Sequence, residues 1–405
     1  MAHRTLITAA RRWANVPVTA RIAVIYVLGR LVTTGFFALA AHLSGPGSRF
    51  GADASIGSFI LGWDAQWYWL VAWEGYPATL PLTESGQVAE NAWAFMPLYA
   101  YAAQVIGIPF GSWGVGALLI SLVAGFFACV VLYRLLRGRI GDSAALWAAT
   151  FFAWGPLAAL FQVGYAEVLF VLLLLVALDL VARRRFVWLY LVIVLMAFTR
   201  PGVLAFALYL GLYGILRWAR RRTDPLPARE VVHIVALGAL ATATGFAWQV
   251  IAGIGTGDPG AYLATELSWR RNWGIDAVGF IPFDGWLQAA QFWFAQWGMP
   301  GWWGVVVLLL LVGGAAAALS FAPQVRRIGV DLRLWSASYL LYLLAVFFPQ
   351  SSTFRLLMPL TPLWGAVAVP RSRIYRLGVL AFCLLGQWAW IYHMYALGNA
   401  YWQVP

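Results

Sequence analysis

The chain of 405 residues contains no lysine and has little charge of either sign. Charged residues make up 10% of the sequence, whereas soluble domains contain about 25%. Hydrophobic residues reach 62% and aromatic residues 16%, including 24 Trp. Apolar segments of the length that crosses a bilayer, roughly 20 residues, recur along the chain. The composition excludes a soluble globular domain and indicates a polytopic membrane protein.

Several motifs of common enzyme classes are missing. The sequence has no Asp-x-Asp, no Walker A loop and no Gly-x-Ser-x-Gly elbow, so nucleotide–metal clamps, phosphate-binding loops and serine hydrolases lack their signatures. The four His residues are scattered and show no metal-ligand spacing. Cys129 and Cys383 lie in apolar segments and are predicted to be packing residues rather than a disulfide. The sequence therefore predicts no metal and no other cofactor.

The arginines predict the orientation in the membrane. The net charge is +12, and the 27 basic residues, all Arg, mostly form short clusters between apolar segments. This pattern is typical of cytoplasmic loops and argues against nucleic acid as a partner. It places the N-terminus in the cytoplasm and most of the 15 acidic residues outside. Arg30 falls within the first span. Five arginines remain outside against the trend, namely Arg49, Arg200, Arg270, Arg271 and Arg355.

The apolar pattern predicts an all-α polytopic membrane protein, one integral domain over 1–405, in the cell membrane. It has about 11 transmembrane helices, near 22–43, 115–136, 144–162, 166–182, 186–199, 202–217, 231–253, 302–323, 333–349, 355–370 and 376–397. Pro97 and Pro109 interrupt segment 93–110, which is placed on or partly in the outer leaflet. Two large outer loops, 44–114 and 254–301, are rich in Trp, Gly and Pro. Short interfacial helices covering a cavity are expected in both.

The first outer loop contains the main catalytic candidate, Asp64, within Trp63-Asp64-Ala65-Gln66-Trp67-Tyr68. On a helix, Trp67 follows Trp63 by one turn and Tyr68 follows Asp64, so the two tryptophans can face lipid while Asp64 and Tyr68 face a cavity. A carboxylate at that depth can meet a lipid headgroup and a water-soluble hydroxyl at the same time, which favours chemistry on a lipid-borne substrate. The alternative interpretation of Asp64 is a helix N-cap.

Three glutamates of the outer side are further candidates. Glu74 can help shape the cavity or be a solvated surface residue. Glu90 can cap the segment that follows it or reach into the site. Glu167 lies at the outer mouth between two spans, where an ionisable residue is costly and often functional. A structural ion pair with an outer arginine is the alternative for Glu167.

The outer arginines are candidates for binding a phosphate. Arg200 and Arg355 interrupt apolar segments, and a guanidinium binds phosphate through paired hydrogen bonds. An ion pair with Glu167 or an ordinary headgroup contact is the alternative for each. Arg270 and Arg271 lie in the second outer loop and can hold phosphate or sugar. Trp269 beside them can stack on a sugar or anchor the loop at the interface.

These motifs together resemble the PIG-V-like mannosyltransferases. The resemblance rests on the Trp63–Tyr68 run, Gly75-Tyr76 and Ala94-Phe95-Met96-Pro97-Leu98-Tyr99. It continues in the same order with Gly155-Pro156, Tyr165 to Phe170, Thr199-Arg200-Pro201-Gly202 and Arg355 to Pro359. The family usually has a second aromatic residue where this chain has Met96. The resemblance implies a GT-C glycosyltransferase with a polyprenyl-phosphate sugar donor, and an acidic residue of the first outer loop, here Asp64, as catalytic base.

The expected activity is transfer of mannose from polyprenyl-phosphate-mannose, on the outer face, to a lipid-linked glycan or a phosphatidylinositol mannoside. Inversion at the anomeric carbon without a metal is expected. Asp64 would be catalytic; the donor phosphate would contact Arg200, Arg355, Arg270 and Arg271; substrates would contact Trp63, Tyr68, Glu74, Glu90, Glu167 and Trp269. The alternatives are a carrier or flippase for a polyprenyl-linked sugar, a non-catalytic scaffold for envelope assembly, and a transferase of arabinose or glucose.

Overall fold

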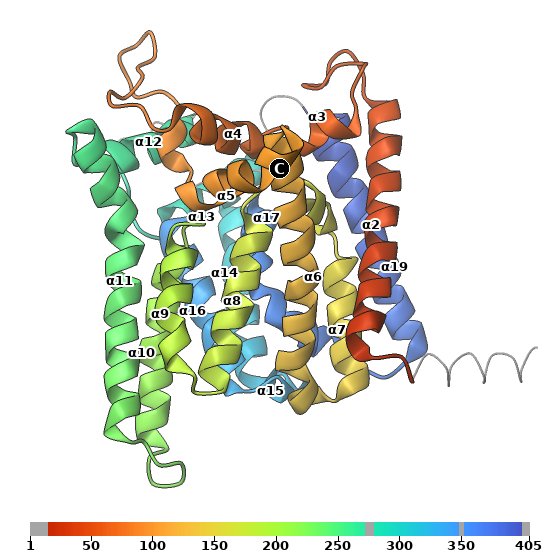
Figure 1. Cartoon of the computed structure of the whole chain (residues 1–405), viewed down its shortest axis with the longest axis vertical. Coiled ribbons are helices and arrows are strands. Elements are labelled where there is room, and N and C mark those ends of the chain that lie inside the picture. Colours follow the sequence, from red (N-terminus) through yellow and green to blue (C-terminus); the bar gives the residue numbers. More distant parts are fainter. Residues whose placement is uncertain (1–14, 272–278, 348–351, 399–405) are drawn as a thin grey trace, which may run out of the picture.

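The computed structural model describes residues 15–271, 279–347 and 352–398, and these residues form a helical bundle (Figure 1). The only β-type pairing among them is an isolated bridge between Leu82 and Val88. The all-α prediction is therefore confirmed. Residues 272–278 of the second loop and 348–349 of one predicted span lie outside the described residues.

Five described helices are long and apolar enough to cross a membrane. They are α2 (Val18–Leu43), α6 (Trp113–Ile140), α11 (Ala228–Thr256), α14 (Gly301–Phe321) and α19 (Arg373–Ile391), which a π-helical turn extends to Ala396. Two shorter apolar helices are α9 (Phe186–Ala197) and α10 (Val203–Ala219). Other described helices of the chain are α7 (Asp142–Ala153), α8 (Glu167–Ala182), α13 (Asp284–Gln296), α15 (Pro323–Arg327) and α16 (Val330–Val346). These helices confirm an integral membrane protein.

Two segments predicted as continuous spans are interrupted. In 144–162, α7 ends at Ala153 and a short 3₁₀ helix, η3 (Ala158–Gln162), follows after a turn. The second segment, 355–370, consists of α17 (Thr353–Leu356), the 3₁₀ helix η4 (Met358–Leu363) and α18 (Trp364–Ala368). Proline has no N–H and disfavours a continuing helix, and both segments contain proline. The expectation of unbroken helices there was wrong because hydropathy alone does not report such breaks.

Arg30 of α2 stabilises the first break. Its buried guanidinium donates hydrogen bonds to the carbonyls of Ala153 and Ala158, the latter at 2.6 Å. Its charge lies 5.0 Å from the ring centre of Tyr26 and 4.6 Å from that of Phe161. Ala153 is the last residue of α7, where carbonyls have no partner within the helix, and apolar surroundings make this costly. Arg30 therefore supplies donors that a broken helix needs inside the bundle.

Replacing Arg30 with Met should destabilise the protein without changing a substrate contact. Each buried carbonyl left without a donor costs about 1–3 kcal/mol, so the melting temperature in detergent should fall by several degrees. Leu31→Met on the same helix is the matched control because Leu31 is 62% exposed. An Arg30→Met protein that melts with the Leu31→Met control would contradict this role.

One end of the bundle, here called the loop end, carries short helices that run across it (Figure 1). They are α3 (Ile56–Ile60), α4 (Asp64–Glu74), α5 (Pro97–Gly107) and α12 (Ala261–Arg271). The 11 residues of α5 span about 16 Å, too short for a hydrocarbon core of about 30 Å. The Leu98 amide donates to the Phe198 carbonyl at 2.9 Å, which fixes α5 over the α9–α10 junction.

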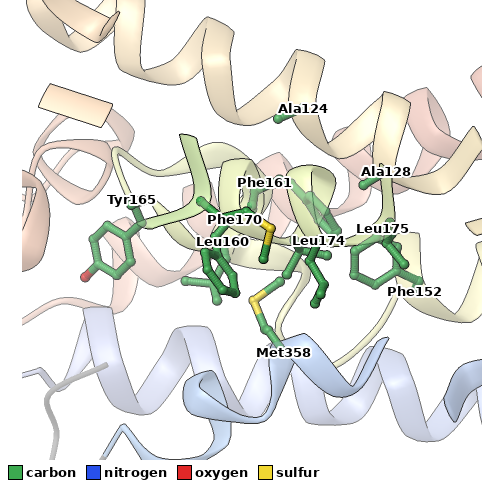
Figure 2. Packing of buried hydrophobic residues seen from close by; sticks show 14 of the residues in the cluster. Ala124, Ala128, Phe152, Leu160, Phe161, Tyr165, Phe170, Leu174, Leu175 and Met358 are labelled. Atoms are coloured by element: carbon green, nitrogen blue, oxygen red, sulfur yellow. The ribbon is translucent and has the colours of Figure 1, made fainter. Parts of the chain in front are cut away.

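The core beneath the loop end is built around α6 and α8 (Figure 2). Ala124 and Ala128 of α6 are small, so the buried Phe170 and Leu174 of α8 approach α6 closely. Figure 2 also shows Tyr165 at one side of this cluster, with its hydroxyl directed away from the apolar side chains. This packing holds the start of α8 in a fixed position below the loop end.

Candidate active site

Asp64 is the first residue of α4, and an unusual backbone places it there. The preceding Trp63 has a φ of 54°, in a region that non-glycine residues rarely adopt, at a cost of about 1–3 kcal/mol. Its indole N–H donates to the Met394 carbonyl at 3.0 Å, and the Arg49 guanidinium lies 4.7 Å from its ring. Trp63, rather than Asp64, occupies the N-cap position, and no side chain caps the helix. The N-cap interpretation of Asp64 therefore does not apply.

Four charged side chains form a continuous chain of ion pairs at the loop end. The Asp64 carboxylate pairs with the Arg355 guanidinium. The same Arg355 nitrogen lies 3.1 Å from Oε1 of Glu167, and Glu167 pairs in turn with Arg200. The four residues come from α4, α17, the first position of α8 and the α9–α10 junction. The fold thus brings together the predicted Asp64, Glu167, Arg200 and Arg355.

The two middle members of this chain are sealed and the two ends are accessible. The side chains of Glu167 and Arg355 are 3% and 8% exposed. Those of Arg200 and Asp64 are 18% and 22% exposed. A ligand can therefore reach the Asp64 carboxylate and the Arg200 guanidinium more readily than the pair between them. Glu167 and Arg355 have the geometry of positioning residues, since each contacts a charged group on both sides.

Burial raises the pKa of Asp64 above its ordinary value, and the adjacent Arg355 opposes that shift. Arg355 also lies 5.3 Å from the ring centre of Tyr165, which adds a cation–π contact to its ion pairs. Tyr68, one turn after Asp64, is buried and packs edge-to-face on Phe95 and Tyr99. The arrangement suits a carboxylate that is ionised yet basic enough to accept a proton.

The tryptophans beside Asp64 do not face lipid, contrary to the sequence prediction. Trp63 is 8% exposed and packs against Phe50. Trp67 stacks on Phe95, with 5.7 Å between ring centres, and meets Trp269 edge-to-face at 5.5 Å. Their rings fix α4 against the α19 end and against α12.

Arg270 and Arg271 have other partners than the ion-pair chain. Arg270 is buried, hydrogen-bonds Gln288 and lies 3.6 Å from Asp284, both on α13. Arg271 donates to the Val88 carbonyl of the first loop. These contacts tie α12 to α13 and to the first loop.

The remaining two glutamate candidates lie at the margin. Glu74, the last residue of α4, is exposed, in agreement with a solvated residue. Glu90 is half-buried, and the residue after it, Asn91, caps η1 (Ala92–Ala94) by accepting the Trp93 amide at 3.1 Å. Asn91 also hydrogen-bonds Thr265 at 2.9 Å, which joins the two loops.

Sequence reasoning missed Glu266 on α12. Its side chain is half-buried and hydrogen-bonded to Tyr262, and burial raises its pKa to about 7, while the charge of Arg200 acts in the opposite direction. In the sequence it was only one of several acidic residues of the outer loops. The available signal was its spacing from Tyr262 and Trp269, which places all three on one helix face.

Comparison with known proteins gives structural likeness only. No family model matches the chain, and no curated protein matches it. ArnT from Cupriavidus metallidurans bound to undecaprenyl phosphate is similar at 16% identity and a TM-score of 0.47, over 90% of this chain and 63% of that chain.

Archaeoglobus fulgidus oligosaccharyltransferase structures are also similar. The complex with Zn and sulfate has 13% identity and a TM-score of 0.43, over 92% of this chain and 52% of that one. AglB with an inhibitory peptide and a dolichol-phosphate has 13% identity and a TM-score of 0.44, over 94% and 56%. The chain therefore spans between 52% and 63% of the length of the chains in these three structures.

Proposed function

We propose that this protein is a GT-C-type membrane glycosyltransferase that moves mannose from polyprenyl-phosphate-mannose to a lipid-linked acceptor. The observation that carries the proposal is the ion-pair chain, in which a carboxylate and a guanidinium stay accessible at the two ends of a sealed pair. A base for a hydroxyl and a cation for a phosphate are the two groups that this reaction needs. The motif resemblance to PIG-V-like mannosyltransferases supports the choice of mannose.

In the proposed reaction, Asp64 accepts the proton of the acceptor hydroxyl while that oxygen attacks the anomeric carbon of mannose. The bond from this carbon to the phosphate oxygen breaks, and its electron pair leaves with the polyprenyl phosphate. The phosphate passes from a singly charged diester to a monoester with more negative charge, which Arg200 stabilises. The proton on Asp64 then returns to water. One displacement inverts the anomeric carbon, and the leaving group carries its charge without requiring a metal.

Arg355 and Glu167 act by position in this proposal. Arg355 orients the Asp64 carboxylate and favours its ionised form, whereas Glu167 holds Arg355 and Arg200 at a fixed separation. Groups held in place before the reaction need no reorganisation when charge develops. A site of this kind tolerates little displacement of any of the four residues.

The location and the acceptor form part of the proposal. Clusters such as Arg183–Arg185 and Arg220–Arg222 follow the ends of α8 and α10 at the opposite end from α4 (Figure 1). By the rule that basic loops stay in the cytoplasm, the loop end faces outward in the cell membrane. A lipid-linked glycan or a phosphatidylinositol mannoside is the proposed acceptor.

The test is transfer by purified protein in lipid vesicles. Polyprenyl-phosphate-mannose labelled in the sugar is mixed with an envelope lipid extract, and labelled products are separated by chromatography. Labelled acceptor lipid supports the proposal. Movement of the donor across the vesicle without transfer would instead identify a carrier, and donors bearing glucose or arabinose test the choice of sugar.

Activity should fall on the acid side of its pH profile. Asp64 must be ionised to act as a base, and burial raises its pKa above the ordinary value. Protonation therefore removes activity as pH falls through that raised pKa, and kcat/KM reports the step in the free enzyme. Initial rates from pH 4 to pH 8 at subsaturating substrate measure it. A profile that stays flat to pH 4 would contradict the role of Asp64.

A further inference from the structure

One face of α12 presents polar groups toward the proposed site. Tyr262, Glu266 and Trp269 follow each other at spacings of four and three residues and therefore share a face. Trp269 contacts Trp67 of α4 edge-to-face at 5.5 Å and Phe95 at 6.0 Å. This face of α12 thus lies against the helix that begins with Asp64.

Glu266 has an environment that the proposed reaction does not yet explain. Its hydrogen-bond partner is the Tyr262 side chain rather than a guanidinium, and it remains half-buried. Arg200 and Tyr342 of α16 are the other groups with which it interacts electrostatically. A carboxyl group placed among tyrosines, near the accessible end of the ion-pair chain, is available to bind hydroxyl groups.

Trp269 adds a hydrogen-bond donor to the same face. Its indole nitrogen is buried and has no hydrogen-bond partner among the described residues. A buried donor left unpaired is unfavourable, so a ligand oxygen at this position would relieve that cost. The three side chains together offer a carboxyl acceptor, a phenol and an indole N–H beside aromatic rings. A sugar has hydroxyl groups, which match the polar groups, and apolar C–H surfaces, which match the rings.

We propose that Tyr262, Glu266 and Trp269 form the subsite that binds the hydroxyl groups of the donor sugar. This inference rests on the proposed function, because it takes Arg200 as the anchor for the donor phosphate. Glu266 lies in the electrostatic field of Arg200, so the sugar attached directly to that phosphate is the part of the substrate within its reach. The Glu266 carboxylate accepts hydrogen bonds from sugar hydroxyls, and the Trp269 N–H donates to one of them.

The affinity of this subsite for the sugar should depend on pH near neutrality. The groups that act on Glu266 are Tyr262 on its own helix, Arg200 from the α9–α10 junction and Tyr342 from α16; Tyr68 of α4 acts on Tyr262. With its pKa raised to about 7, Glu266 is neutral in mild acid and anionic in mild base. The anion accepts hydroxyl hydrogen bonds more strongly, so binding of the sugar should strengthen as pH rises through 7.

The experiment compares a ligand that carries the sugar with one that lacks it; the second is a phosphate monoester with more negative charge, so wild type and variant are compared for each ligand at each pH. Dissociation constants of polyprenyl-phosphate-mannose and of polyprenyl phosphate are measured for the full-length wild type and for Glu266→Gln, at pH 6 and pH 8. At pH 8 the variant should bind the mannose-bearing ligand about tenfold more weakly and polyprenyl phosphate within about twofold of wild type. It should also lose the pH dependence. Glu84→Gln is the matched control, since Glu84 is exposed in the first loop.

The outcomes separate this inference from the proposed function. Equal affinity of wild type and Glu266→Gln for the mannose-bearing ligand would overturn the subsite, and so would an equal loss for both ligands. If Glu266→Gln weakens binding of the mannose-bearing ligand alone but the wild type transfers no mannose, the proposed function is wrong and the subsite remains supported. Trp269→Phe keeps an aromatic ring, although a smaller one, and removes the N–H, so a several-fold loss confined to the mannose-bearing ligand is expected from a second, independent variant.

Discussion

Asp64→Asn should lower the rate of transfer at least about a hundredfold, because general-base groups contribute typically 10²–10⁴-fold. Asparagine has nearly the same shape and keeps an oxygen that can accept a hydrogen bond from Arg355. It cannot take up a proton from the acceptor hydroxyl at neutral pH. Arg355 remains paired with Glu167, and Arg200 keeps its own contact with Glu167. The affinity for the donor should therefore stay within a few-fold of wild type.

Asp53→Asn is the matched control for this variant. Asp53 belongs to the same loop and is exposed, so its replacement removes the same charge without touching the ion-pair chain. Transfer rates at saturating donor and donor dissociation constants are measured for both variants. Activity of Asp64→Asn above about a hundredth of wild type, with Asp53→Asn unchanged, would remove Asp64 from the role of base.

Arg355→Met should produce the second large effect, on both stability and activity. The side chain is 8% exposed and touches two carboxylates, Asp64 and Glu167. Removing one partner of a buried ion pair typically costs about 3–5 kcal/mol, because the remaining charge is left without compensation. The melting temperature in detergent should fall clearly. Transfer should be lost as well, since the Asp64 carboxylate is no longer oriented.

A second substitution distinguishes stability from catalysis. Arg355→Met leaves two carboxylates with one guanidinium, that of Arg200; adding Glu167→Gln restores a balance of one carboxylate and one guanidinium, so part of the melting temperature should return. Activity should not return, because nothing orients Asp64. Recovery of transfer together with stability would show that Arg355 serves the fold alone. Arg333→Met, which removes a partly exposed arginine bonded to the Leu319 carbonyl, controls for the loss of one arginine.

The sequence predicted the long helices of the bundle better than the breaks between shorter ones. Long apolar runs such as those of α2, α6 and α11 follow directly from the cost of exposing polar groups to lipid. The segments that contain the breaks after Ala153 and around Met358 are also apolar, so a hydropathy profile does not reveal these breaks. Arg30 was the clue to the first break, since a buried arginine needs acceptors and the end of a helix provides them.

The residue types in the sequence indicated candidates for the site, and the structure shows which of them contact one another. Arg200 and Arg355 were candidates because arginine is less common on the outer side of a membrane protein, and both form ion pairs with Glu167 in the structure. The hydrogen bonds of Arg270 to Gln288 and of Arg271 to the Val88 carbonyl could not be predicted, because an uncharged amide and a backbone carbonyl carry no sequence signal for pairing. Glu266 was missed because an acidic residue in a loop is usually solvated.

The burial of Trp63 depended on a segment far away in the sequence. Its partner is the backbone carbonyl of Met394, more than three hundred residues later. A backbone carbonyl exists at every position, so no residue pattern marks the one that will accept this bond. The helical spacing of the residues correctly predicted a helix at α4, but the prediction that the tryptophans beside Asp64 face lipid was wrong.

A single-turnover experiment tests the central claim most directly. Wild-type and Asp64→Asn proteins, each preloaded with labelled polyprenyl-phosphate-mannose and shown by filtration to hold the same amount, are mixed with the acceptor lipid extract and quenched over time. Wild type should release its label to an acceptor lipid in one turnover, while the variant keeps its bound donor intact. Equal release by the two proteins, or none by a wild type saturated with donor, would contradict a transferase that uses this carboxylate as its base.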